Sequence, residues 1–224
     1  MKKLKYILFL ATLFSMNLYA LLPPSVGVLT KVIQTVDYKS GEAGDWDPAK
    51  LGGILYDGDE LRTGDRSLAL LKFLDNSLLR VRENSIVTIY GTKEDSKLSK
   101  NTFIQQGKVG FDITEQEDQE FKFTTPTGVA SIRGTKGFFD VPLDGSMILF
   151  VKEGLVEIES LLGSKATGSV GGGQLAKITP DGELSIVQAD DKTNKEFDAV
   201  EKDSTKRIRI KLDNGDEYIL EYLE

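Results

Sequence analysis

A long succession of short apolar segments, separated by turns that contain glycine and aspartate, is the feature that most restricts how this chain can fold. Between Ile54 and Val187 these segments alternate apolar and polar residues and are rich in Val, Ile, Leu and Phe. The separating residues include Asp57-Gly58-Asp59, Gly107, Gly154 and Pro180-Asp181-Gly182. Short β-branched segments between such turns predict an all-β fold. No period of fixed length recurs, so the sequence is not that of a repeat array.

The centre of the chain, residues 121–137 (FKFTTPTGVASIRGTKG), predicts a strand, a turn, a second strand and a corner. Pro126 fixes its own backbone φ and keeps Thr125 extended, which suits the turn. Gly134 and Gly137 stand beside bulky strand residues. Glycines in such positions indicate a chain that bends tightly while it is packed.

The segment TPTGVASIRGTKGFFDV resembles the core signature of the FecR domain, a domain of the bacterial cell envelope. The resemblance extends upstream through LYDGDELRTGDRSLALLKFLDNSLLRVRENSIVTI and QQGKVGFDI, and downstream through VKEGLVEIES and GGGQLAKITPDGEL. It covers about Gly27 to Val187. One departure is Asp75-Asn76-Ser77, where the family usually has Asp-Gly-Ser. Asparagine tolerates a positive φ better than most residues, so the turn is expected to persist.

The FecR resemblance implies a compact, solenoid-like β domain over residues 26–188, built from many short strands. A jelly-roll-like sandwich is the alternative architecture. In the best-known members of the family, the domain lies outside the inner membrane, receives a signal from an outer-membrane transporter and passes it to a cytoplasmic arm that controls a sigma factor. We expect this chain to lack such an arm and therefore to act through a partner.

Residues 1–20 predict a signal peptide, which places the protein in the periplasm or outside the cell. Three lysines precede an apolar run from Tyr6 to Leu13, and Ala20 supplies a small residue for cleavage. The apolar run is short for a membrane span, although an uncleaved N-terminal anchor is the alternative. Removal of this leader leaves 25 basic and 35 acidic side chains, a net charge near −10. That charge argues against nucleic acid or an anionic membrane surface as a partner.

The C-terminal part differs in character from the rest. Residues 189–206 are charged and predict a linker or one short helix that uses Phe197 and Val200. Residues 207–223 predict a β-hairpin, because two alternating segments flank Asn-Gly, the strongest short hairpin signal. An isolated hairpin is marginally stable in water, so we expect it to dock on the main domain or to pair with another chain.

The chain contains no cysteine and no histidine. Disulfides, Ser-His-Asp and Cys-His triads, and zinc sites built on His or Cys are therefore excluded. Carboxylates are the remaining acid–base candidates, and most stand in turns, where aspartate typically accepts hydrogen bonds from its own backbone. Calcium at Asp57-Gly58-Asp59 or at residues 213–216 stays open, although neither follows the spacing of a calcium loop. We predict no cofactor and no enzymatic activity.

Five residues are candidates for contacts with a partner: Trp46, Arg133, Ile208, Ile210 and Tyr218. Trp46 is the sole tryptophan and stands in a predicted polar loop, residues 38–50, either as a lid over one end of the core or as an aromatic anchor. Arg133 either binds acceptors within the fold or meets a partner. The other three belong to the predicted hairpin, a candidate for strand addition.

These observations predict a non-enzymatic protein-interaction or signal-relay module of the cell envelope. Its partner would be an envelope protein or a cell-wall polymer, and the oligomeric state is left open. A cell-wall polysaccharide-binding module is the first alternative. A carbohydrate-active enzyme that uses two carboxylates on a β-solenoid is the second.

Overall fold

The computed structural model describes residues 25–94, 97–115, 121–203, 205–212 and 217–223. The predicted signal peptide and the turn at residues 213–216 lie outside the described residues. Within these ranges one helix accompanies 17 strands, which confirms the all-β prediction. Fifteen of the strands form one sheet that does not close into a barrel, and the last two form a separate hairpin.

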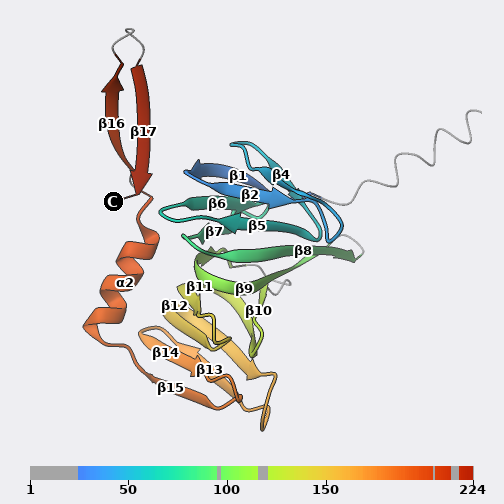
Figure 1. Ribbon diagram of the computed structural model, residues 1–224. Helices are drawn as coiled ribbons and strands as arrows, with labels where there is room; N and C mark the ends of the chain where they lie inside the picture. The colour runs from blue at the N-terminus through green and yellow to red at the C-terminus, as the bar shows by residue number, and fades with distance from the viewer. Residues whose placement is uncertain (1–24, 95–96, 116–120, 204, 213–216, 224) are drawn as a thin grey trace, which may run out of the picture.

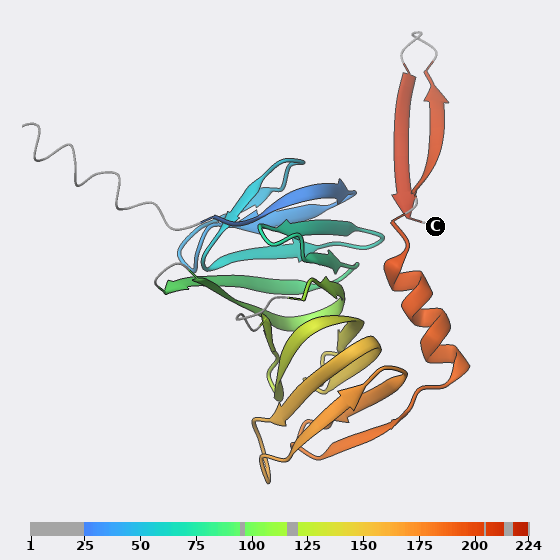
Figure 2. The same ribbon diagram turned by 180° about the vertical axis from the view of Figure 1, so that it is seen from behind.

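The large sheet folds into two layers that pack face to face (Figures 1 and 2). We call them layer A and layer B. Layer A runs through β3 (Trp46–Pro48), β2 (Val36–Lys39), β5 (Asp59–Thr63), β8 (Ile86–Glu94), β9 (Lys97–Ile113), β10 (Phe121–Thr124), β11 (Gly128–Val141), β12 (Met147–Ser160) and β13 (Thr167–Gly171). Layer B runs through β4 (Ile54–Tyr56), β1 (Ser25–Ile33), β6 (Leu68–Phe73), β7 (Leu78–Val81), then the same β9, β11 and β12, and finally β14 (Gln174–Ile178) and β15 (Leu184–Gln188).

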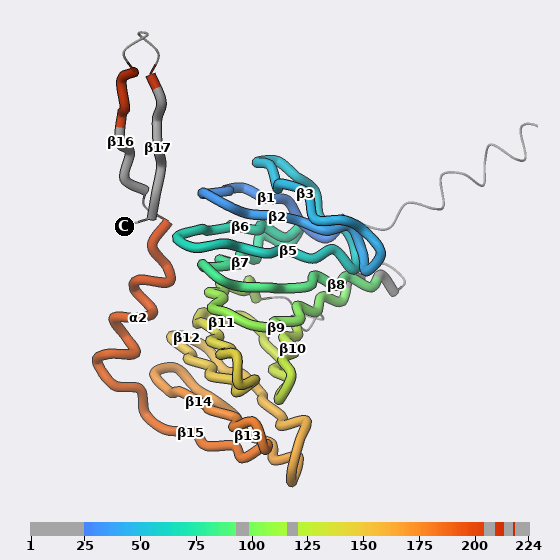
Figure 3. The backbone as a smooth tube through the Cα atoms, in the orientation of Figure 1, coloured from blue at the N-terminus to red at the C-terminus, as the bar shows by residue number. Residues whose placement is uncertain are grey.

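Three long strands, β9, β11 and β12, belong to both layers because each bends at a glycine with a positive φ. The bends lie at Gly107 (φ +97°), Gly134 (φ +61°) and Gly154 (φ +94°). Before Gly107, β9 pairs with β8 and β10, whereas from Gly107 onward it pairs with β7 and β11. The continuous backbone can be followed through these strands in Figure 3. The sequence predicted separate strands on either side of Gly107 and Gly154. That prediction was wrong, because a positive φ redirects the strand without ending its pairing.

The core lies between the layers and is centred on Phe123 of β10. Its ring centroid is 4.8 Å from that of Phe139, 4.9 Å from that of Phe121 and 5.4 Å from that of Phe111. Such tilted and stacked pairs are favourable beyond the area that they bury. Of these four rings, Phe139 belongs to the segment that carries the FecR core signature, so that segment contributes directly to the centre of the core.

The predicted polar loop at residues 38–50 contains part of β2 and the whole of β3. Lys39 pairs with Trp46 and Tyr38 with Asp47 in this short ladder. The strand was missed because β3 lies at an edge of the sheet, where few side chains are buried and polar residues are favoured.

The charged segment after β15 contains helix α2 (Asp191–Glu201), in which Phe197 and Val200 are buried. Asp190 caps the helix by accepting a hydrogen bond from the Thr193 amide at 2.7 Å. The hairpin of β16 (Thr205–Lys211) and β17 (Glu217–Leu223) follows. It projects beyond both layers in Figures 1 and 2, and β17 approaches β1. The helix in the described ranges is not long and apolar enough to cross a membrane.

The turn that departs from the family pattern joins β6 to β7 in layer B and reaches layer A through an ion pair. Asn76 adopts a φ of +70°, and Asp75 accepts a hydrogen bond from the Ser77 amide at 3.0 Å. Asp75 also pairs with Lys100, a buried residue of β9 on layer A. Burial alone would raise the pKa of Asp75, but hydrogen bonds from Lys100 and from Ser77 outweigh it and hold the pKa below its usual value.

We expect Gly137→Ala to destabilise the protein by about 3 kcal/mol, because core overpacking against a fixed backbone has this order of cost. A Cβ on Gly137 would lie 2.1 Å from the Phe150 carbonyl oxygen. Gly171→Ala is the matched control, since a Cβ there meets its nearest atom at 3.4 Å. Urea denaturation of both variants measures the difference. Equal midpoints would show that β11 and β12 can separate at this point.

We expect Asp75→Asn to cost about 3 kcal/mol at pH 7, because it leaves the ammonium group of Lys100 buried without its charged partner. The folded pKa of Asp75 is lowered, so its contribution is complete above the usual pKa of about 3.9 and is lost as the pH falls through the folded pKa. The gap in unfolding free energy between wild type and variant should therefore be constant from pH 7 to about 5 and narrow toward pH 3. Urea midpoints across this range test it, and a gap that widens in acid would contradict the assignment.

Candidate functional site

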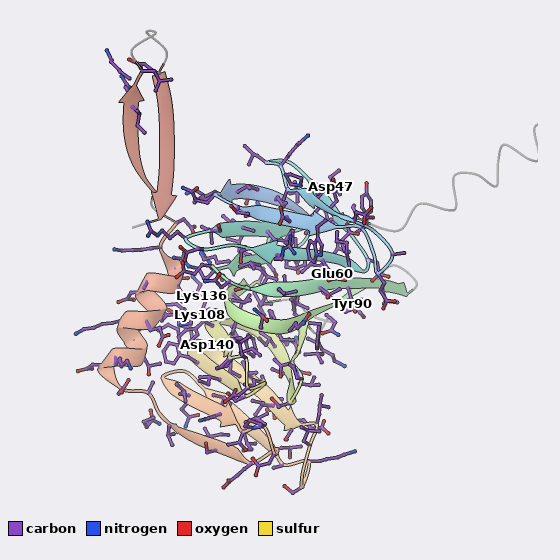
Figure 4. The ribbon with its side chains drawn as sticks, viewed as in Figure 1. Asp47, Glu60, Tyr90, Lys108, Lys136 and Asp140 are labelled. Atoms are coloured by element: carbon purple, nitrogen blue, oxygen red, sulfur yellow. The ribbon has the colours of Figure 1, made fainter. Side chains whose placement is uncertain are left out.

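A hollow of about 620 Å³ opens at the end of the sandwich where β3 and β4 leave free strand edges. Its walls are mainly apolar and come from both layers. The apolar and aromatic lining includes Leu29, Tyr38, Pro48, Ala49, Ile54 and Leu55. Asp47 and Lys50 add one charge of each sign, and Figure 4 shows Asp47 at this end of the molecule.

Two large apolar side chains beside the hollow are exposed to solvent. Leu51 is 71% exposed and Ile54, in the edge strand β4, is 51% exposed. Asp59 also lines the hollow, but it is buried and accepts hydrogen bonds from the amides of Tyr56 at 2.8 Å and Gly41 at 3.3 Å. This carboxylate therefore stabilises a turn. An unpaired strand edge next to an apolar hollow suits the addition of an extended peptide.

Trp46 lies on the outer face of layer A, on the opposite side of β3 from the hollow. Its ring contacts the guanidinium of Arg62, whose Cζ lies 4.4 Å from the ring centroid, and Lys39 Nζ lies 5.5 Å away. Arg62 in turn pairs with Asp37 at 2.7 Å, and Lys39 pairs with Glu60 at 2.7 Å. The aromatic ring is thus held in a charged cluster of β2, β3 and β5.

The other predicted contact residues are not brought together. Arg133 is exposed on β11, directly before the bend, and pairs in register with Leu155 of β12. In the hairpin, Ile210 pairs with Tyr218, and Ile208 with Leu220. Ile210 is 44% exposed. These positions and Trp46 define separate surfaces, so no single site contains all five predicted residues.

A second surface, missed by the sequence analysis, lies on the outer face of layer B beneath α2. One register row crosses the layer from β1 to β14, and we call it the strap row. Its members are Lys31, Leu70, Arg80, Gly110, Phe138, Phe150 and Leu175. Helix α2 lies beside β9, β11 and β12, which contribute Gly110, Phe138 and Phe150 to this row (Figure 2). Phe138 and Phe150 form an apolar cluster with Phe197 and Val200 of the helix, separate from the main core.

Polar contacts fasten α2 and the residues after it at both ends. Lys152 Nζ donates to Asn194 Oδ1 at 3.1 Å near the start of the helix. Near the other end, Arg80 Nε lies 3.3 Å from Asp203 Oδ1, and Arg82 Nη1 donates to the Lys202 carbonyl at 2.9 Å. Lys31 Nζ donates to the Asp203 carbonyl.

Lys108 of β9 stands at the middle of the helix and pairs with both Glu196 of α2 and Asp140 of β11. Figure 4 shows Lys108 and Asp140 on the side of the sheet that faces α2. Burial would lower the pKa of Lys108, but its hydrogen bond to Glu196 and the charge of Asp140 outweigh burial and raise the pKa. This lysine is therefore a firmly charged attachment point for the helix.

One sequence signal could have indicated this surface. Phe138 and Phe139 are adjacent in a strand, so they must point to opposite faces. Phe139 enters the main core, and Phe138 therefore needs a separate cover on the outer face. The rest of the strap row joins residues from strands far apart in sequence, and no local pattern marks it.

The carboxylates give little support to acid–base or metal chemistry. Across residues 25–94, 97–115, 121–203, 205–212 and 217–223, no group of three or more Asp or Glu side chains is placed to hold a metal ion. The Ser146 amide lowers the pKa of Asp144, the Thr179 hydroxyl lowers that of Asp181, and the Thr193 amide lowers that of Asp190. These aspartates accept hydrogen bonds in turns and at a helix cap, whereas a general acid requires a raised pKa.

Part of the chain matches the model of a known protein family. Residues 59–157 match the family model described as FecR protein. No curated protein matches the chain. A crystal structure at 2.50 Å of a "putative anti-sigma factor" from Parabacteroides distasonis superimposes with a TM-score of 0.51 at 14% sequence identity. The superposition covers 58% of this chain and 60% of the Parabacteroides distasonis chain.

A second crystal structure of the same description, at 1.65 Å, gives a TM-score of 0.49 at 12% identity with the same coverage. The chain thus spans about 60% of the length of the solved structures that it matches.

We expect Arg62→Ala to shift the fluorescence emission of Trp46 to longer wavelength, because the variant removes the guanidinium that covers the ring. The loss of stability should be about 0.5–1 kcal/mol, as for other partly exposed cation–π pairs. Trp46 is the sole tryptophan, so the signal has one source. Arg66→Ala is the control, since Arg66 is 74% exposed and pairs only loosely with Asp65 at 3.7 Å. An equal shift in both variants would contradict the described cluster.

Proposed function

We propose that the chain is a non-enzymatic signal-relay module of the bacterial cell envelope that acts by binding another protein, on the premise that residues 59–157, which match the FecR family model, form a FecR domain. The family match is the observation that carries this proposal. The fold shared with the Parabacteroides distasonis structure is consistent with it. A periplasmic or secreted location is part of the proposal and follows from the envelope association of the family and from the predicted leader.

Two observations favour protein binding as the means of relay. The strand edges of β3 and β4 are free of β partners in the described part of the chain and flank an apolar hollow. An extended segment of a partner could pair with β4 while its alternate side chains enter the hollow. The hairpin β16–β17, whose strands pair with each other alone among the described strands, offers a further surface for strand addition.

The absence of catalytic activity is supported by the chemistry of the carboxylates. Asp144, Asp181 and Asp190 have a lowered pKa because they accept hydrogen bonds from turn and cap residues. The pKa of Asp75 is lowered by hydrogen bonds from Lys100 and from Ser77, which outweigh its burial. A carboxylate with a lowered pKa is a poor proton donor at neutral pH. These aspartates fit structural roles in turns, caps and the pair with Lys100.

Binding of a cell-wall polysaccharide is the second candidate function, favoured by aromatic residues on the outer face of layer A. Trp46 and Tyr90 point to the same side of this layer, as the register through Lys39, Glu60 and Thr88 requires. Tyr90 is 38% exposed. Aromatic rings combine an apolar face with a polar tip, which suits a ligand with both kinds of surface.

We expect a photo-crosslinking residue at Leu51, next to the hollow, or at Ile210, in the hairpin, to capture one and the same envelope protein in living cells. Leu143 is the matched control, because it is an equally apolar and more exposed residue (88%) in the turn between β11 and β12. Mass spectrometry of the cross-linked bands identifies the partner. A band from Leu143 of the same identity and intensity would show that capture reflects exposure alone.

If neither position captures a protein and the chain is retained on isolated cell wall, polysaccharide binding becomes the favoured function. In that case Tyr90→Ala and Trp46→Ala should each reduce retention. If both variants are retained as well as the wild type, the aromatic face does not bind the cell wall.

A further inference from the structure

Helix α2 contacts the sheet in the way that a bound peptide ligand contacts a docking face. The helix covers the strap row through two buried side chains, Phe197 and Val200, which are separated by one helical turn. Among the described residues, the other contacts that fasten the helix and residues 202–203 are polar and use basic side chains on the sheet side, namely Lys31, Arg80, Arg82, Lys108 and Lys152. The sheet therefore offers a basic and aromatic surface, and α2 supplies the acidic and apolar complement.

The helix has little intrinsic stability of its own. It is 11 residues long, which is short for an isolated helix in water. Its last turn contains no basic residue, and Glu201 stands at its C-terminal end, where the helix dipole disfavours a negative charge. Its helical form therefore depends on the strap row, and detachment is expected to unfold it.

The fit at the end of the helix is incomplete. Arg80 has an 11% exposed side chain, yet its Nη1 has no hydrogen-bond partner in the described part of the chain and lies 3.8 Å from the nearest oxygen of Glu201. A buried guanidinium nitrogen without an acceptor is unfavourable. A segment with a better placed carboxylate would satisfy it, so α2 does not use everything that the face provides.

Gly110 gives the row a specific shape. A Cβ at this position would lie 2.6 Å from Val200 Cγ1, so the absence of a side chain makes the recess that Val200 fills. Phe138 and Phe150 form the adjacent wall, and the Phe150 ring centroid lies 5.7 Å from that of Phe197. The recess, the aromatic wall and the flanking basic residues together define which side chains a ligand must carry.

We propose that α2 is a releasable strap over a docking face, and that the occupant of the uncovered face is an acidic helical segment of a partner protein with an aromatic and a branched aliphatic residue three positions apart. The pattern is that of α2 itself, Phe-x-x-Val with flanking carboxylates. Charge complementarity with the five basic residues selects an acidic segment over a basic one. The inference concerns a face other than the hollow and the hairpin, so it stands independently of the function proposed above.

The test uses a disulfide lock, which the chain permits because it has no cysteine of its own. Gly110→Cys and Val200→Cys together place two thiols at the recess. A Cβ on residue 110 would lie 2.6 Å from the Cγ1 position of residue 200, so the two thiols are close enough for a bond. The probe is a fluorescein-labelled peptide with the sequence of residues 189–203 (ADDKTNKEFDAVEKD). Fluorescence polarisation measures its binding to the otherwise intact chain.

For the redox comparison the peptide carries alanine in place of Val200, because the side chain introduced by Gly110→Cys fills the recess that this valine would enter. The reduced double-cysteine chain should bind that peptide, and the oxidised chain should bind it at least tenfold more weakly. A chain with Phe197→Ala should bind at least tenfold more tightly than the oxidised chain, because the strap has lost its aromatic contact. The control peptide carries alanine in place of Phe197 and Val200, keeps every charge, and should bind poorly. Circular dichroism checks that the sandwich is folded in each variant.

Equal binding by the reduced and oxidised chains would overturn the proposal, as would absence of binding by both the reduced chain and the Phe197→Ala chain. The comparison of the two redox states uses one protein and does not depend on the opened variant. Disulfide-linked dimers on a non-reducing gel, in place of the internal disulfide, would also overturn it, since α2 of a second copy would then be the occupant.

Discussion

The bends in β9, β11 and β12 are the constraint on which the rest of the structure depends. Each of these strands contributes to both layers, so the layers are covalently joined three times within the core and cannot slide past each other. The bends require a positive φ, which Gly107, Gly134 and Gly154 supply at low cost. Among the described strands of the sandwich, the free edges consequently lie at its two ends, at β3 and β4 and at β13 and β15.

The same alternation that fills the core also creates the need for α2. Phe138 points outward because Phe139 points inward, and Phe150 pairs with Phe138 on the same outer face. Burial of Phe197 and Val200 over these rings contributes about 1.5–3 kcal/mol each. Ordering one residue costs about 1–2 kcal/mol of backbone entropy, so eleven helical residues are not ordered by two apolar contacts alone. Helical hydrogen bonds and the five basic residues that contact the strap must supply the remainder, which makes the helix sensitive to ionic conditions.

Local patterns in the sequence were sufficient for the fold class and for the central aromatic residues. Alternation and Gly/Asp turns predicted strands correctly around Phe121, Phe123 and Val141, and Asn76 adopts the positive φ that the turn required. The layers themselves could not be predicted, because a glycine that bends a strand and a glycine that ends one look alike in sequence. The surfaces were less predictable still. Trp46 was singled out, but its contact with Arg62 depends on the register of β2 with β3 and β5.

Strand β1 connects the two surfaces that the sequence did not reveal. Leu29 lines the hollow, and Lys31, two residues further on, donates to Asp203 at the end of the strap. The register of β1 against β6 is irregular between these residues, so this part of the strand already departs from regular pairing. Energetic coupling between sites requires contiguous packed contacts that have more than one arrangement. A peptide added at the free edge of β4 would be separated from β1 by β4, and β1 contacts the residues after α2 through the side chain of Lys31. A displacement of β1 would act on the Lys31 contact, whereas Arg80, Arg82, Lys108 and Lys152 hold the strap from positions that do not line the hollow.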